Sequence, residues 1–179
     1  TNCTEYNSAY LLIVCVSPIK INRMILAPAG IKAGRFCLAT GVTAYLADSA
    51  ETALYEAVFR RELKTYVALE DLRLKALGTF TSKKPLRLVD LRGLEEQYPV
   101  LQSQRIQHTQ AFAEECFGDG YDGILYASAQ HPHHECVCLF EVGAKKLGFA
   151  EALPLVTPGT DILHSAVVDA ARRSGVEIT

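Results

Sequence analysis

The sequence has no excess of positive charge. Lys and Arg together number 18 against 20 for Asp and Glu, which gives a formal net charge of −2. A protein that binds nucleic acid nonspecifically usually carries a surplus of basic residues, because contacts to the phosphate backbone supply most of the attraction. Binding to an acidic lipid surface draws on the same kind of charge. We therefore expect no direct nucleic-acid binding and no membrane attachment.

Long apolar runs and paired cysteines are missing too. The longest apolar run, AYLLIVCVSPI at 9–19, is shorter than the roughly 20 residues that a membrane-spanning helix needs. No basic segment precedes this run and no small-residue cleavage site is evident, so we expect no signal peptide. The six cysteines form no CxxC pair and no disulfide framework. This pattern favours free thiols in a reducing cytoplasm.

Motifs of several common enzyme folds are also absent. Neither GxGxxG nor GxxxxGK[ST] occurs, so a Rossmann or P-loop nucleotide site has no support. No GxSxG pattern surrounds Ser128, which argues against this serine as a hydrolase nucleophile. A hydrogen-bonding role fits Ser128 better.

One histidine-rich segment carries zinc-type ligands without a zinc-type spacing. The chain has no HExxH helix and no two ligand pairs that would converge from separate elements. Neighbouring residues on a strand point to opposite faces, so the ligands on the strand cannot all converge. We expect a polar loop and no metal site at these residues: His131, His133, His134, Glu135, Cys136 and Cys138.

What the sequence does contain fits one globular domain. Of the 179 residues, 49% are apolar and 21% are charged, which is an ordinary globular mix. Strands and helices are predicted without a clean βαβ alternation, which favours a compact α+β (mixed α/β) domain. Strands are expected at 9–16, 42–47, 65–74, 86–91, 123–128 and 136–142, and helices at 49–64, 103–117 and 164–174.

The helix expected at 49–64 has the clearest pattern. Asp48 and Glu51 have the spacing of a capping box. Apolar residues then recur at the i, i+3, i+4, i+7 and i+8 positions of an amphipathic helix. Glu56 lies at the flank of this apolar stripe. It fits either a solvated helix glutamate or a carboxylate at the rim of a cleft.

Arg35 and Tyr45, which both precede this helix, also allow two interpretations each. Arg35, which follows Gly34, is either an ordinary surface charge or a two-pronged donor to a diphosphate. Tyr45, on the strand expected at 42–47, is either a core aromatic or a face on which a ligand stacks. Taken singly, none of these residues assigns a function.

Two segments together resemble the RES-domain family, which is named for its arginine, glutamate and serine. GRFCLATGVTAYLADSAETALYE at 34–56 is similar to the first family signature: a GRF or GRW loop, a YLA-like strand and a TAxxE helix. HTQAFAEECFGDGYDGILYASAQHP at 108–132 is similar to the second: a TQxxA helix and a YDGIxYxS strand. The resemblance implies a single RES domain over 1–179, with a motif core at about 23–142 and an N-terminal strand extension at 1–20.

The resemblance implies an NAD+-consuming bacterial toxin whose core sheet is like that of ADP-ribosyltransferases. Characterised members split the nicotinamide–ribose bond of NAD+ by hydrolysis or phosphorolysis, and at least one is reported to ADP-ribosylate a protein. We therefore expect NAD+ as the substrate, phosphate as a candidate co-substrate, and no cofactor. The acceptor stays open among water, phosphate and a protein side chain. An inactive protein-binding module is the non-enzymatic alternative.

The resemblance also implies a partner. Family toxins are usually paired with a helix-turn-helix antitoxin, which we expect to cover the active site. A homo-oligomer of the toxin within such a complex is compatible with the same reading.

Residue roles follow from the motif positions in the resemblance. The expected catalytic residues are Arg35, Glu56 and Ser128. Arg35 would clamp the diphosphate, Glu56 would stabilise the oxocarbenium-like centre of the ribose, and Ser128 would position the ligand. Nicotinamide leaves as a neutral base, so no strong general acid is required. The expected substrate-binding set is Arg35, Tyr45, Ser128, Phe36 and Tyr126.

The chain departs from the family pattern at two places. Many relatives carry Trp-Asn after the arginine, whereas this chain has Phe36-Cys37. Relatives often place a second arginine after the serine, whereas this chain has Ala129-Gln130. If that second arginine recruits phosphate, phosphorolysis is less favoured here.

Overall fold

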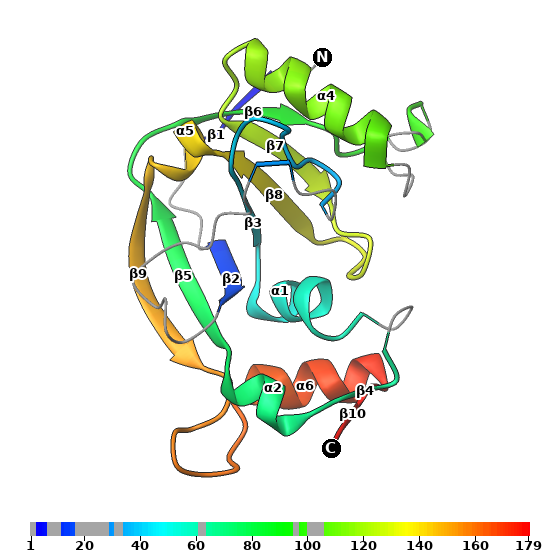
Figure 1. Ribbon diagram of the computed structural model, residues 1–179, viewed down its shortest axis with the longest axis vertical. Helices are drawn as coiled ribbons and strands as arrows, with labels where there is room; N and C mark the ends of the chain where they lie inside the picture. The colour runs from blue at the N-terminus through cyan, green and yellow to red at the C-terminus, as the bar shows by residue number, and fades with distance from the viewer. Residues whose placement is uncertain are drawn as a thin grey trace.

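The computed structural model describes residues 3–6, 12–16, 29–30, 34–60, 64–94, 97–99 and 106–179. Within these residues, eight strands form one sheet in the order β1-β6-β7-β8-β3-β2-β5-β9 (Figure 1). The strands are β1 (Cys3–Tyr6), β2 (Leu12–Val16), β3 (Thr43–Ala47), β5 (Ala76–Ser82), β6 (Leu86–Asp90), β7 (Gly123–Ala127), β8 (Glu135–Phe140) and β9 (Leu147–Pro154).

The sheet is mostly antiparallel. Among the described strands of this sheet, only β6 and β7 pair in parallel, and α4 (Ile106–Gly118) lies between them in the chain. A second, two-stranded parallel sheet joins β4 (Tyr66–Val67) to β10 (Glu177–Ile178). The other helices whose bounds the described residues give are α1 (Ala50–Ala57), α2 (Leu69–Arg73), α5 (Glu141–Ala144) and α6 (Ser165–Ser174).

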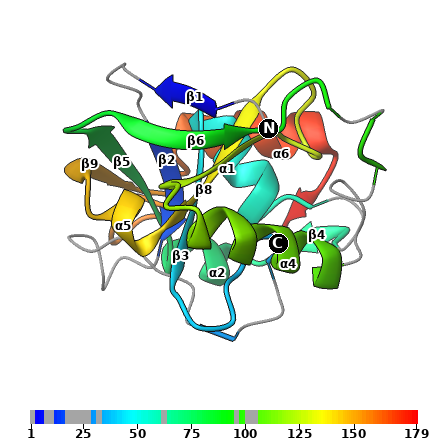
Figure 2. The same cartoon turned by 90° about the horizontal axis from the view of Figure 1, so that it is seen from above.

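Three helices contribute to one core beside the sheet. Helix α4 packs beside β7, whereas α1 packs against α6, β2 and β3 (Figures 1 and 2). Fully buried side chains from these three helices, Leu54, Ala113 and Val167, belong to one hydrophobic core. No helix in the described part of the chain has the length and apolarity needed to cross a membrane.

Strand β8 shows why the central strands read as continuous apolar runs. Successive side chains on a strand point to opposite faces. Cys136, Cys138 and Phe140 therefore join the core that contains α1, α4 and α6, while Val137 and Leu139 join a second core on the other face. Both faces of β8 are buried, so the strand lacks the polar alternation of a half-exposed strand.

The predicted mixed α/β fold is confirmed, as are most of its elements. The strands expected at 42–47, 86–91, 123–128 and 136–142 correspond to β3, β6, β7 and β8. The helices expected at 103–117 and 164–174 correspond to α4 and α6, with 103–105 outside the described residues. The first predicted strand, 9–16, is confirmed over β2, and its residues 9–11 lie outside the described residues.

The segment 65–74 was predicted wrongly as one strand. Only Tyr66–Val67 is extended, and Leu69–Arg73 forms helix α2. Glu70 and Asp71 lie in the first turn of this helix, where acidic side chains are favoured by the helix dipole. Leu72 is fully buried, so one buried leucine anchors the short helix to the core.

Helix α1 is shorter than predicted and begins differently. Ser49, not Asp48, is the N-cap, and its side chain accepts a hydrogen bond from the Thr52 N–H. The helix ends at Ala57 rather than at 64. The next two residues, Val58 and Phe59, are both buried. Because neighbours on a helix point in different directions, leaving the helix lets the chain bury both.

Strands β5 and β9 were not predicted. Strand β5 has the sequence ALGTFTS and β9 has LGFAEALP. Alanine and glycine are depleted in strands, so the sequence gives these segments a weak strand signal. The strand predicted at 136–142 also ends earlier, at Phe140, where α5 begins.

Candidate active site

The sheet brings two of the predicted site residues to the same end. Strands β3 and β7 both run antiparallel to β8, so they run in the same direction as each other. Helix α1, which carries Glu56, follows the end of β3, and Ser128 follows the end of β7. The two residues therefore meet beside the first residues of β8.

Glu56 and Ser128 are joined by a direct hydrogen bond. The Ser128 hydroxyl donates to Oε1 of Glu56 at 2.6 Å. The same hydroxyl oxygen accepts hydrogen bonds from the backbone N–H groups of Gln130 (3.2 Å) and His131 (3.0 Å). Ser128 is only 8% exposed, whereas Glu56 is half-buried. The serine therefore fixes one carboxylate oxygen of Glu56 and organises its own loop at the same time.

Cys136 is a second donor to Glu56. Its thiol lies 3.9 Å from Oε1 of the glutamate. Burial raises the pKa of the Cys136 thiol well above its ordinary value, and the negative charge of Glu56 acts in the same direction. The thiol therefore stays protonated and remains a hydrogen-bond donor. Sequence reasoning missed this contact, because Cys136 and Glu56 are brought together only by the pairing of β8 with β3 and β7.

Arg35 lies in a tight turn that several other elements hold in place. The Cys37 N–H donates to the Gly34 carbonyl at 3.3 Å, which closes the turn. The Gly34 carbonyl also accepts from the Gln110 side chain of α4 at 3.1 Å. The Phe36 N–H donates to the Tyr45 hydroxyl of β3 at 2.9 Å. The loop therefore reaches across the sheet from β3 to α4.

The guanidinium of Arg35 stacks on aromatic side chains. Its central carbon lies 4.8 Å from the ring centroid of Tyr126 and 5.5 Å from that of Phe36. These cation–π contacts orient the guanidinium. Arg35 forms no ion pair with any described residue, including Glu56. The three namesake residues thus comprise one bonded pair, Glu56–Ser128, and an arginine that stacks on Tyr126, two residues before Ser128 in the chain.

The aromatic residues of the predicted set have different surroundings. Phe36 is fully buried and packs against Tyr126, with ring centroids 5.0 Å apart. Burial raises the pKa of the Tyr126 hydroxyl well above its ordinary value; Arg35 lowers it and Glu56 raises it. The charges of Arg35 and Glu56 therefore both act at this hydroxyl. Tyr45 is partly buried, and burial, followed by Cys138, raises the pKa of its hydroxyl.

Residues 131–134 of the histidine-rich segment form a loop, as expected, and this loop contacts α1, whereas Glu135, Cys136 and Cys138 lie on β8. Nδ1 of His131 lies 2.8 Å from the Thr52 hydroxyl, and Nδ1 of His134 lies 3.0 Å from Oδ2 of Asp48. The described residues contain no group of three or more His, Cys, Asp or Glu side chains arranged to hold a metal ion. His133 is exposed and has a positive φ of 69°.

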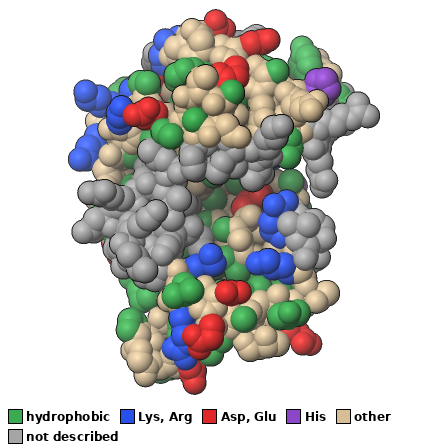
Figure 3. Space-filling model, viewed as in Figure 1, with side chains coloured by type: hydrophobic (Ala, Val, Ile, Leu, Met, Phe, Trp, Pro, Cys, Tyr) green, Lys and Arg blue, Asp and Glu red, His purple; other side chains and the backbone are tan. Residues whose placement is uncertain are grey.

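One face of the molecule is hollowed and carries both signs of charge. In the view of Figure 3, a hollow lies between the part of the molecule that carries α4 and the part that carries α6, with acidic and basic side chains in and around it. Glu56 and Arg35 are both half-buried. Such an arrangement can bind a ligand that has an anionic part for the guanidinium and a hydroxyl or developing positive charge for the carboxylate.

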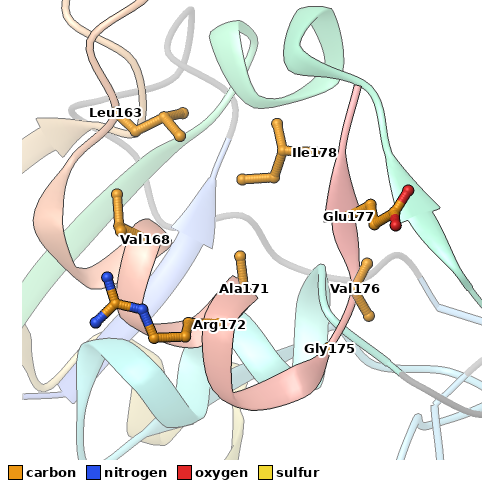
Figure 4. Close-up of a pocket in the computed structure, with 8 residues that line it drawn as sticks. All are labelled: Leu163, Val168, Ala171, Arg172, Gly175, Val176, Glu177 and Ile178. Carbon is orange, nitrogen blue, oxygen red and sulfur yellow. The ribbon is translucent and has the colours of Figure 1, made fainter.

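A separate shallow pocket lies beside α6 and β10 (Figure 4). Leu163, Val168 and Ile178 line it with aliphatic side chains, and Arg172 and Glu177 add charge. None of the predicted site residues lines this pocket. Glu56 and Ser128 lie instead beyond the ends of β3 and β7.

Comparisons with known proteins agree with this fold. One chain of the crystal structure of the M. tuberculosis MbcT–MbcA toxin–antitoxin complex matches with a TM-score of 0.66 and 14% sequence identity, over 84% of this chain and 86% of the matched chain. At this identity the likeness concerns the fold. Comparison with curated protein sequences gives no match. The family model of the RES domain matches residues 19–157. Because this match covers most of the chain, the protein belongs to the RES-domain family.

Proposed function

We propose that this protein is the toxin of a toxin–antitoxin pair and that it breaks the nicotinamide–ribose bond of NAD+ at Arg35, Glu56 and Ser128. Membership of the RES-domain family and the fold shared with a toxin–antitoxin complex support this proposal. The observation that carries it is the 2.6 Å hydrogen bond between Ser128 and Glu56, with Arg35 stacked on the neighbouring Tyr126.

Glu56 supplies the electrostatic part of the proposed reaction. Its Oε1 accepts hydrogen bonds from Ser128 and Cys136, and Oε2 accepts none from the described residues. Oε2 is then the oxygen that accepts a ribose hydroxyl and faces the positive charge that develops on the ribose. A preorganised carboxylate held away from bulk water stabilises such a charge more strongly than a solvated one.

The bond that breaks joins the ribose C1′ to the nicotinamide nitrogen. The bonding electrons go to the pyridinium nitrogen, and nicotinamide leaves neutral without needing a proton. When water is the acceptor, its oxygen bonds to C1′ and one proton is released, so the products are nicotinamide and ADP-ribose. Glu56 therefore serves as a charge stabiliser in this step, and no general acid is assigned.

Arg35 binds the diphosphate in this proposal. A guanidinium presents paired donors that match phosphate oxygens, and stacking on Tyr126 fixes its plane. Phe36 is fully buried, so its contribution is to support Tyr126 and Arg35 from beneath. The Tyr45 hydroxyl holds the arginine loop, which leaves the ring of Tyr45 as a stacking face for nicotinamide or the adjoining ribose.

Water is the favoured acceptor over phosphate. Ala129 and Gln130 stand where relatives often carry a second arginine, and the Gln130 N–H is used to hold Ser128. The proposal needs no cofactor, because NAD+ is the substrate. It also includes an antitoxin that covers the NAD+ site, in line with the complex formed by the structural neighbour.

Product analysis tests this function. The purified protein is incubated with NAD+, with and without inorganic phosphate, and the products are separated by chromatography. We expect nicotinamide and free ADP-ribose in equal amounts under both conditions. A phosphorylated ADP-ribose formed only with phosphate would replace water by phosphate as the acceptor. A second reaction adds the protein and labelled NAD+ to a cell lysate, and label that appears only on a lysate protein would indicate transfer to protein. No loss of NAD+ in either the purified or the lysate reaction would refute the enzymatic proposal.

A further inference from the structure

Two stacked histidines fasten the loop after β7 to the start of α1. The rings of His131 and His134 lie with centroids 3.8 Å apart and planes 11° from parallel. His131 bonds the Thr52 hydroxyl through Nδ1 at 2.8 Å, and His134 bonds the Asp48 carboxylate through Nδ1 at 3.0 Å. Because a carboxylate only accepts, Nδ1 of His134 carries the proton in that bond.

These contacts hold both members of the Glu56–Ser128 pair. The His131 N–H donates to the Ser128 hydroxyl at 3.0 Å, and the Ser128 N–H donates to the His134 carbonyl at 2.8 Å. Thr52 lies four residues before Glu56 on α1, so the two share one face of the helix. The histidine pair therefore ties the serine loop to the same helix face that carries the glutamate.

Thr52 connects His131 further to the helix N-cap. The Thr52 side chain is fully buried, and its hydroxyl lies 2.7 Å from that of Ser49. With a neutral His131, a chain of donors can run from the Ser49 hydroxyl to the Thr52 hydroxyl and on to Nδ1 of His131. Each polar atom in this chain then has a partner, as buried polar groups require.

The surroundings of His131 disfavour a positive charge on its ring. The charged and titratable groups that face it are His134 from its own loop, Asp48, Glu51 and Tyr55 from α1 or the residues before it, and Arg173 from α6. Burial lowers the pKa of His131, and His134 and Arg173 act in the same direction. Glu51 and Asp48 oppose the shift without cancelling it. His131 is therefore neutral at neutral pH.

We propose that His131 is a positioning residue for the NAD+ cleavage, and that its neutral ring, stacked on His134 and bonded to Thr52, holds Ser128 at Glu56 until protonation releases the loop. This inference rests on the proposed function for its effect on catalysis. The geometry of the latch, defined as His131, His134, Thr52 and Asp48, stands independently of that function.

The sign of the pH effect follows from proton linkage. In the closed latch, in which His131 bonds Thr52 and stacks on His134, the pKa of His131 is lowered. The closed latch therefore binds fewer protons than the open latch, in which these contacts are broken. The closed state is therefore fully favoured above the ordinary histidine pKa and loses its advantage as the pH falls through the lowered pKa. Activity should fall in the same window, on the order of tenfold per pH unit for one proton.

The first test compares pH profiles of kcat/KM for nicotinamide release. His131→Asn keeps a hydrogen-bonding group near the position of Nδ1 but cannot gain a proton. His133→Asn is the matched control, because His133 is exposed in the same loop and its φ of 69° suits asparagine. We expect the acid limb to lie at the same pH in wild type and His133→Asn and to move to lower pH in His131→Asn. An acid limb that persists unchanged in His131→Asn would overturn the proposal.

The second test does not depend on activity. NMR follows the ring of His131 and the backbone N–H groups of Gln130 and His131 in the wild-type protein as the pH is lowered. We expect both amide signals to shift together with the His131 ring, at a pH below the ordinary histidine pKa. Amides that stay constant while His131 titrates would rule the latch out. If NAD+ is not consumed at any pH, the proposed function fails and this measurement still decides the latch.

Discussion

At the scale of single residues, the candidate site depends on contacts between side chains that no sequence motif predicts. The resemblance to the RES-domain signatures selected Arg35, Glu56 and Ser128 from the sequence. It could not show that Ser128 donates to Glu56, or that Cys136 donates to the same oxygen. These contacts join residues 72 and 80 positions apart, and they depend on strand pairing that local sequence patterns do not determine.

Replacing Ser128 with alanine should lower both the activity and the stability of the protein. Ser128→Ala removes the donor to Glu56 and leaves two loop N–H groups without their acceptor. We expect kcat for nicotinamide release to fall about tenfold or more, and the free energy of unfolding to fall by about 1–3 kcal/mol. Steady-state kinetics and urea denaturation measure the two effects.

A matched serine and a double mutant sharpen this test. Ser165 is exposed at the start of α6, so Ser165→Ala should change neither quantity appreciably. Because Ser128 acts through Glu56, adding Ser128→Ala to Glu56→Gln should cost little further activity. Losses that multiply in the double mutant would show that the two residues act separately.

At the scale of elements, the loop at 34–37 has a structural reason for its glycine. A Cβ on Gly34 would meet the Tyr45 hydroxyl at an impossibly short separation and would lie 2.6 Å from Sγ of Cys37. The glycine thus lets the turn lie against Tyr45, which holds the turn through the Phe36 N–H. The sequence shows that Arg35 follows Gly34, but the close approach to Tyr45 appears only in the folded chain.

Gly34→Ala should therefore destabilise the loop that carries Arg35. We expect a loss of about 1–3 kcal/mol in the free energy of unfolding, because neighbouring groups must shift to admit the methyl group. Gly118→Ala is the control, since Gly118 ends helix α4 and a Cβ there meets nothing within 4 Å. Urea denaturation of both variants makes the comparison, and equal stability in the two would contradict this account of the turn.

Other elements show where local pattern stopped being sufficient. Short apolar runs located β3, β6, β7 and β8 correctly, because these strands are strongly apolar. Helix α1 ends before the predicted boundary since Val58 and Phe59 must both be buried. The segment 65–74 became two short elements because Leu72 is anchored in the core. Tertiary packing decided these boundaries, and sequence periodicity does not report it.

At the scale of the whole molecule, the order of strands creates the site. The mixed α/β class was predictable from the sequence, whereas the position of β8 between β3 and β7 was not. That order brings the end of β3, with α1 after it, and the end of β7 to one edge. The long-range pairing also includes β5 and β9, whose composition gave little strand signal. The family resemblance selected the candidate site residues, which local propensity alone does not identify.

The central claim is that the carboxylate of Glu56 drives NAD+ cleavage. The most direct measurement is the rate of nicotinamide release by Glu56→Gln beside wild type and Glu115→Gln, an exposed control on α4. Glutamine can still accept from Ser128 but carries no charge, so we expect a loss of about 10²–10³ in kcat. Melting temperature and the activity of Glu115→Gln should stay close to wild type. A folded Glu56→Gln that releases nicotinamide at the wild-type rate would contradict the account.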